Sequence, residues 1–116
     1  MKRSFRLTRT SDFKRVRRLG KSYAHALIVL VALPAETGNT QIGVAGGRSV
    51  GGAVQRNRAK RILREAMRPY MDCVLPGWQI VLLARRPLAE ASLQDAQTAL
   101  HQLLAQAGLL KETDGI

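Results

Sequence analysis

The strongest periodic pattern of apolar and polar residues in this chain lies between Gly51 and Arg68. If the stretch is a helix, each residue turns by about 100°, so that positions three and four apart share a face. One arc is then apolar: Ala59, Ile62, Leu63, Ala66 and Met67. The opposite arc carries cations and one amide: Arg56, Asn57, Lys60, Arg61, Arg64 and Arg68. The pattern predicts a helix that is anchored in a hydrophobic core and presents positive charge to an anion.

A shorter helix is expected over residues 11–19. Side-chain oxygens between Thr10 and Asp12 could cap its first turn, and Gly20 could end it. Phe13 and Val16 would face inward. The other positions are strongly basic, which alone is typical of a solvated surface: Lys14, Arg15, Arg17 and Arg18.

Strands are predicted on both sides of the basic helix. Residues 22–33 form one strand, or a short and a long strand separated near His25, and the turn at 35–39 suggests a hairpin to a strand over 41–46. Residues 78–84 are apolar throughout, which is typical of a strand buried on both faces in a parallel pair. Strand, basic helix and strand would then form a βαβ crossover.

The last helix is predicted to begin after Ser92, which with Asp95 resembles a capping box, and to end near Gly108. Its inward arc would be Leu93, Ala96, Leu100, Leu103, Leu104 and Ala107. Its outward positions, among them His101, carry almost no charge, so we expect this helix to cover the core and not to bind a ligand.

Composition indicates the kind of partner. The 116 residues fit one domain, residues 1–116, and carry 19 Lys and Arg against 8 Asp and Glu, a net charge of +11. Such a charge points to nucleic acid or an anionic membrane surface. The longest apolar run, Ala26 to Pro34, is far shorter than the ~20 residues of a membrane-spanning helix. No apolar signal segment follows the basic start, and a single Cys73 excludes an internal disulfide, so we expect a cytoplasmic protein.

The sequence predicts no catalytic residue and no metal site in the protein itself. The acids are scattered and the two histidines have no ligand spacing. The glycine-rich link from Gly46 to Gly52 matches neither the Walker pattern nor the dinucleotide pattern, so nucleotide binding is rejected. Free N–H groups at the helix start, with Arg48 and Ser49, could still bind an RNA phosphate.

RNA is the expected nucleic acid. Aromatic residues are only 4% of the chain, which limits base stacking, and no helix-turn-helix or zinc-finger spacing is present. A basic helix held in a βαβ unit would address phosphates along an RNA groove or junction rather than a DNA major groove. Two further cations, Arg85 and Arg86, follow the strand over 78–84.

The residues from Ala53 to Glu65 closely resemble the signature of the bacterial ribonuclease P protein subunit, with Arg56-Asn57-Arg58, Lys60-Arg61 and Arg64-Glu65 at the family's spacing. The resemblance implies an α+β fold, a small sandwich with a central mixed sheet of about four strands and three helices. It also implies αβββαβα order with a left-handed βαβ crossover. It implies a protein that binds the catalytic RNA of ribonuclease P and helps it remove the 5′ leader of precursor tRNA, while the RNA performs the chemistry with Mg²⁺.

The resemblance also suggests two binding regions. The residues expected to contact the catalytic RNA are Arg48, Arg56, Asn57, Arg58, Lys60, Arg61, Arg64 and Arg68. The residues expected in a leader-binding cleft between the first helix and the sheet are Phe13, Lys14 and Arg17. The family often has aromatic residues where Arg17, Ile28 and Val31 stand, so this cleft is expected to be less aromatic than usual.

Two other functions fit the same charge and size. A structural RNA-binding protein of the ribosomal type would have no role in cleavage, and the signature from Arg56 to Arg64 argues against it. A nuclease that works without RNA would need an active site that the sequence does not offer.

Overall fold

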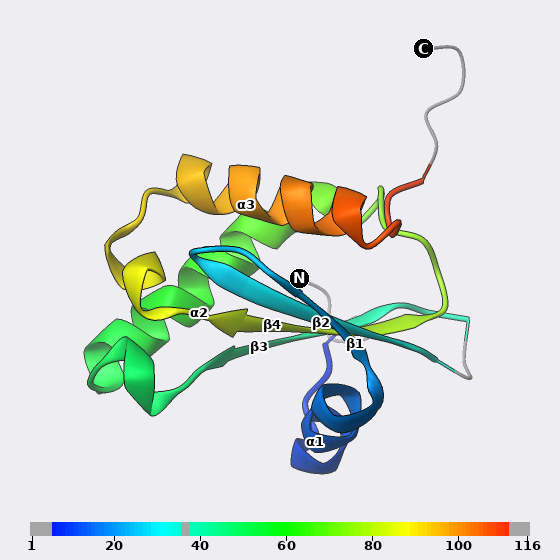
Figure 1. The fold of residues 1–116 in the computed structure, drawn as a ribbon, viewed down its shortest axis with the longest axis horizontal. Helices are drawn as coiled ribbons and strands as arrows, with labels where there is room; N and C mark the ends of the chain where they lie inside the picture. Colours follow the sequence, from blue (N-terminus) through cyan, green and yellow to red (C-terminus); the bar gives the residue numbers. More distant parts are fainter. Residues whose placement is uncertain (1–5, 36–37, 112–116) are drawn as a thin grey trace.

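The computed structural model describes residues 6–35 and 38–111, which form one mixed sheet with helices on both faces. Figure 1 shows α1 (Thr10–Leu19) on one face and α2 (Ala53–Met67) and α3 (Leu93–Gln106) on the other. The strands are β1 (Lys21–Ala24), β2 (Ile28–Pro34), β3 (Gln41–Gly46) and β4 (Trp78–Ala84). Short 3₁₀ turns are η2 (Arg48–Val50), η3 (Arg68–Tyr70) and η4 (Arg86–Glu90). The predicted α+β class and αβββαβα order are confirmed.

The strand order is β1-β2-β4-β3, which shows that the predicted hairpin between the second and third strands is wrong. β4 lies between them, antiparallel to β2 and parallel to β3. Because β4 is buried along most of its length, its backbone groups need partners on both sides, which only a central position provides. The parallel β3–α2–β4 crossover is confirmed, and its left-handedness stays a prediction. Part of the turn predicted at 35–39, residues 36–37, lies outside the described residues.

The predicted break near His25 is confirmed. β1 and β2 are antiparallel neighbours, and the turn between them is closed by two bonds at His25. Its backbone N–H donates to the carbonyl of Ile28 at 2.8 Å, and its Nδ1 accepts from the N–H of Leu27 at 3.1 Å.

Of the two predicted N-terminal helix caps, one is confirmed and one is wrong. Asp95 N–H donates to Ser92 Oγ at 3.0 Å, as expected for the start of α3. The expected cap of α1 is wrong, because the helix begins at Thr10 and its cap residue, Arg9, makes no side-chain bond.

One residue of the predicted inward arc of α3 is not buried. Leu93 was expected inside but is 44% exposed, because it is the first residue of α3 and lies at the end of the buried stretch. Ala99 occupies the interior instead.

Two separate hydrophobic clusters lie on the two faces of the sheet. The larger one fills the space between the sheet, α2 and α3, with Ile80 and Leu82 of β4 at its base. The smaller one lies under α1 and has four buried members: Leu7, Val16, Val31 and Val81. One short helix therefore covers the second face, and it covers that face only in part.

The α1 face of the sheet consists of three cross-strand rows set by the strand register. From one end of β4 to the other, the rows are Val29–Leu83–Ala45, Val31–Val81–Gly43 and Leu33–Gln79–Gln41. α1 crosses the middle row, with Val16 against the two valines and the Phe13 ring against Gly43. The first and third rows remain as the floors of open cavities on the two sides of α1.

Candidate nucleic-acid interface

The amphipathic pattern of α2 divides in the structure as the sequence predicts. Four members of the apolar arc, Ala59, Leu63, Ala66 and Met67, are fully buried, and Ile62 is half-buried. On the other arc Arg56 and Lys60 are half-buried, and Asn57, Arg61, Arg64 and Arg68 are exposed. Arg58, which was also predicted to bind RNA, is exposed but lies between the two arcs. The apolar arc contributes to the larger core, so the cations stand on a rigid support.

Most of these cations have no carboxylate partner. In the part of the chain that the structure describes, only two ion pairs are present, Arg68 with Glu65 at 3.3 Å and Arg15 with Asp12 at 3.6 Å. Unpaired cations along a helix create a positive potential that favours a polyanion.

The end of β3 supports the first turn of α2 at close range. A Cβ on Gly46 would lie 3.1 Å from the carbonyl oxygen of Arg56, so only glycine allows this approach without a shift of the backbone. Arg56 Nε is buried and, among residues 6–35 and 38–111, has no hydrogen-bond partner. The close approach of Gly46 to the Arg56 backbone packs the start of the cationic row against the sheet.

Three arginines from three elements line one cavity beside the start of α2. The cavity has a volume of about 1030 Å³ and is lined by Arg48 of η2, Arg58 of α2 and Arg86 of η4, together with Glu90. Arg48 and Arg58 were predicted as RNA-binding residues. Arg86 was outside the predicted set, although an adjacent arginine pair at the end of a buried strand could have indicated it.

The three residues predicted for the leader cleft do not share one cavity. Arg17 lines a cavity of about 600 Å³ over the first row, here called the Arg17 cavity, with Val29, Ala45, Leu83, Arg85 and Arg86 among its other walls. Phe13 lines a smaller pocket of about 220 Å³. Lys14 is exposed on α1 and lines neither.

The pocket at Phe13 joins the two predicted binding regions. Its other walls include Arg64 of α2 and Arg6, which precedes α1. Arg64 was predicted to contact one RNA and Phe13 another, whereas the structure brings both side chains to one pocket. Sequence spacing gave no sign of this, because it depends on where α1 and α2 lie relative to β3, whose Ile42 and Val44 line the same pocket.

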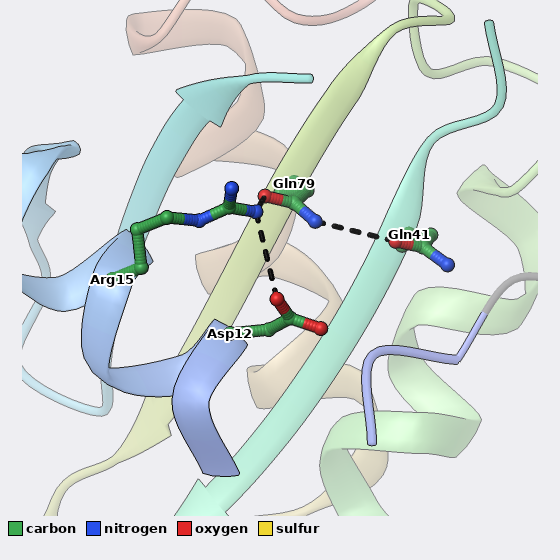
Figure 2. A network of polar contacts seen from close by, with 4 residues as sticks. All are labelled: Asp12, Arg15, Gln41 and Gln79. Atoms are coloured by element: carbon green, nitrogen blue, oxygen red, sulfur yellow. Dashed lines mark hydrogen bonds and ion pairs between the residues drawn. The ribbon is translucent and has the colours of Figure 1, made fainter. Parts of the chain in front are cut away.

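A polar network between α1 and the third row was also missed (Figure 2). Arg15 Nη2 donates to Gln79 Oε1, and Gln79 Nε2 donates to Gln41 Oε1 at 3.3 Å. Asp12 holds the same arginine nitrogen from the start of α1. The single amide within the apolar run of β4 was the available signal.

Among the residues that the structure describes, no three His, Cys, Asp or Glu side chains form a group that could hold a metal ion. No helix in the described ranges is long and apolar enough to cross a membrane.

Comparisons with known proteins agree on one family. The sequence pattern of the family described as Ribonuclease P matches residues 1–108. The ribonuclease P protein component of Herpetosiphon aurantiacus is 40% identical over 109 residues, covering 94% of this chain and 89% of its own. That of Roseiflexus is 38% identical over 115 residues, covering 98% and 94%.

Solved structures agree as well. The RNase P protein of Staphylococcus aureus superposes with a TM-score of 0.81 at 26% identity, over 92% of this chain and 98% of its own. The RNase P protein of Thermotoga maritima superposes with a TM-score of 0.76 at 27% identity, over 87% and 96%.

Proposed function

The chain belongs to the ribonuclease P protein family, which provides a subunit of a ribonucleoprotein nuclease of tRNA processing, and from this membership we propose that it binds two RNAs at once. One is the catalytic RNA of ribonuclease P, and the other is the 5′ leader of precursor tRNA. The protein acts in the cytoplasm and makes no contact with DNA or membrane.

The observation that carries this proposal is the row of unpaired cations on α2. Arg56, Lys60 and Arg64 recur at helical spacing on a helix whose other face is fixed in the core. Such a row matches regularly spaced phosphates, and it would position an RNA without reading its sequence. Arg48, Arg58 and Arg86 extend the positive surface around the start of the same helix.

The leader is proposed to lie along the side of α1 that carries Arg17. The Arg17 cavity has an aliphatic floor, with Val29 and Leu83, and arginines at its edge. Aliphatic contacts and guanidinium groups would replace much of the aromatic stacking that is common in the family. Phe13 supplies the aromatic surface nearby, at the pocket that Arg64 also lines.

The protein contributes charge and position, and the RNA contributes the chemistry. Catalytic RNA and precursor tRNA are both polyanions and repel each other. A protein that contacts both lowers this repulsion and reduces the amount of Mg²⁺ needed to hold them together. Mg²⁺ serves the RNA in this proposal, and no residue of the protein is assigned to bind it.

Reconstitution tests the proposal. The full-length protein is combined with a bacterial ribonuclease P RNA and a precursor tRNA, and cleavage is measured across Mg²⁺ concentrations. We expect stimulation that is largest at low Mg²⁺, and no cleavage by protein without RNA. A protein that binds RNA but leaves cleavage unchanged at every Mg²⁺ concentration would instead be a structural RNA-binding protein.

A further inference from the structure

The buried contacts of α1 lie along the middle row of the sheet. The Phe13 ring lies against Gly43, and Val16, the only fully buried residue of α1, packs on the two valines of this row. Directly after α1, a Cβ on Gly20 would lie 2.8 Å from Cγ1 of Val31, which belongs to the same row. Contacts along one row hold a helix in place but leave it able to tilt toward the row on either side.

A polar contact holds α1 from outside this row. Arg15 Nη2 donates to Gln79 Oε1 of the third row, and Asp12 pairs with the same nitrogen at 3.6 Å (Figure 2). Gln79 is itself held, because its Nε2 donates to Gln41 Oε1 at 3.3 Å. The acceptor therefore has a fixed place, and its bond to Arg15 resists a tilt of α1 away from the third row.

Gln79 requires a hydrogen-bond partner at this position. It is only 7% exposed, in a strand that is otherwise apolar. A buried amide is costly when its oxygen or its nitrogen has no partner. The guanidinium of Arg15 can only donate, and its charge strengthens the bond to the amide oxygen. The contact therefore differs from an ordinary surface pair, although the Arg15 side chain is itself 43% exposed.

Arg17 lies on the opposite side of the same helix. Residues 15 and 17 are each about 100° from residue 16 around the helix, in opposite directions. Val16 faces the sheet, so Arg17 lines the Arg17 cavity over the first row, whereas Arg15 lines a cavity of about 370 Å³ over the third. A tilt that separated Arg15 from Gln79 would therefore change the height of Arg17 above the first row.

We propose that Arg15 is a positioning residue for the leader. Its bond to Gln79 keeps α1 from tilting and so holds Arg17 at the height over Val29 and Leu83 that leader binding requires. Arg15 itself does not contact the leader, because it lies on the other side of α1. The inference rests on the proposed function, since it requires that the leader lies in the Arg17 cavity.

Binding of precursor tRNA is measured with the full-length protein assembled with catalytic RNA, and mature tRNA is the leaderless reference. Arg15→Met removes the donor with little change in side-chain length. It should weaken binding of precursor tRNA about three- to tenfold, no more than the loss of Arg17 itself, and leave binding of mature tRNA unchanged. Arg15→Lys keeps a donor and should restore most of the affinity. Arg18→Met removes the same charge from an exposed position of α1 and should change neither affinity.

Gln79→Leu distinguishes positioning from attraction by charge. It removes the buried acceptor and leaves the charge of Arg15 in place. It should also weaken binding of precursor tRNA about three- to tenfold, and Arg15→Met in the same protein should add little. Unchanged binding by Gln79→Leu would mean that Arg15 acts through its charge, which would overturn the positioning role. This variant also provides the test where Arg15→Met does not fold.

A double-variant cycle identifies the residue through which Arg15 acts. In protein that already carries Arg17→Ala, Arg15→Met should weaken binding by less than about twofold, because the side chain that it positions is absent. Two losses that multiply would overturn the proposal, and so would equal losses for precursor and mature tRNA. A wild-type protein that does not prefer precursor tRNA and does not stimulate cleavage would overturn the proposed function, and this inference with it.

Discussion

The aromatic ring of Phe13 lies directly against Gly43, in space that a Cβ at this glycine would occupy. The absence of a side chain on the middle row therefore determines how closely α1 approaches the sheet. We expect Gly43→Ala to displace the ring and to lower the free energy of unfolding by about 1–3 kcal/mol, as overpacking does. Urea denaturation measures the change. The control is Gly38→Ala, since no atom of the residues that the structure describes lies within 4 Å of a Cβ there. Equal stability of the two variants would contradict the expectation.

The cationic row of α2 predicts a change in salt dependence. Replacing Arg56, Lys60 and Arg64 by alanine should leave the fold intact and weaken binding to catalytic RNA. Each lost phosphate contact should also reduce the slope of log K against log salt by up to about 0.7–0.9. Titrations at several salt concentrations provide the slope. Lys111→Ala removes an exposed cation beyond α3 and should leave the slope unchanged. A triple variant with the wild-type slope would exclude α2 as the RNA-binding face.

Arg17 should matter for the leader and not for the rest of the substrate. We expect Arg17→Ala to weaken binding of precursor tRNA about tenfold, which corresponds to one hydrogen bond with a charged donor. Binding of mature tRNA, which has no leader, should not change. Arg18→Ala is the matched control, because Arg18 is exposed on the same helix but does not line the Arg17 cavity. An equal loss for both tRNAs would place the leader elsewhere.

Truncation of a buried side chain in the larger core should cause a substantial loss of stability. Leu82 is fully buried at the base of this core, so Leu82→Ala should lower the free energy of unfolding by about 2–5 kcal/mol. Val54 is 78% exposed, and Val54→Ala should change stability by less than about 0.5 kcal/mol. Thermal or chemical denaturation compares the two. Similar stabilities would mean that Leu82 is not part of a tightly packed core.

Features that depend on neighbouring residues in sequence could be predicted. The two arcs of α2 follow from helical spacing alone, and the residues of β4 follow from one unbroken apolar run. The split of the first strand near His25 and the cap at Ser92 are equally local. In each of these the sequence pattern is itself the cause of the structure.

Features that depend on distant segments could not be predicted in the same way. The turn after β2 suggested a hairpin, but β2 and β3 each pair with β4 and not with each other. The pocket that Phe13 and Arg64 both line, and the bond from Arg15 to Gln79, likewise require knowing which row of the sheet α1 crosses. A lone amide in an apolar strand indicates that a hydrogen-bond partner exists, but not which residue provides it.

The central position of β4 also bears on how the chain folds during synthesis. β2 and β3 cannot complete the sheet alone, because the strand that joins them lies more than thirty residues further along the chain. The helix that carries the cationic row is made before this strand, so its apolar face has no completed sheet to pack against until residue 84 has left the ribosome. The cationic row that is proposed to bind RNA therefore gains its fixed support only after residue 84 has emerged, so we expect RNA capture by this row to follow the synthesis of all four strands.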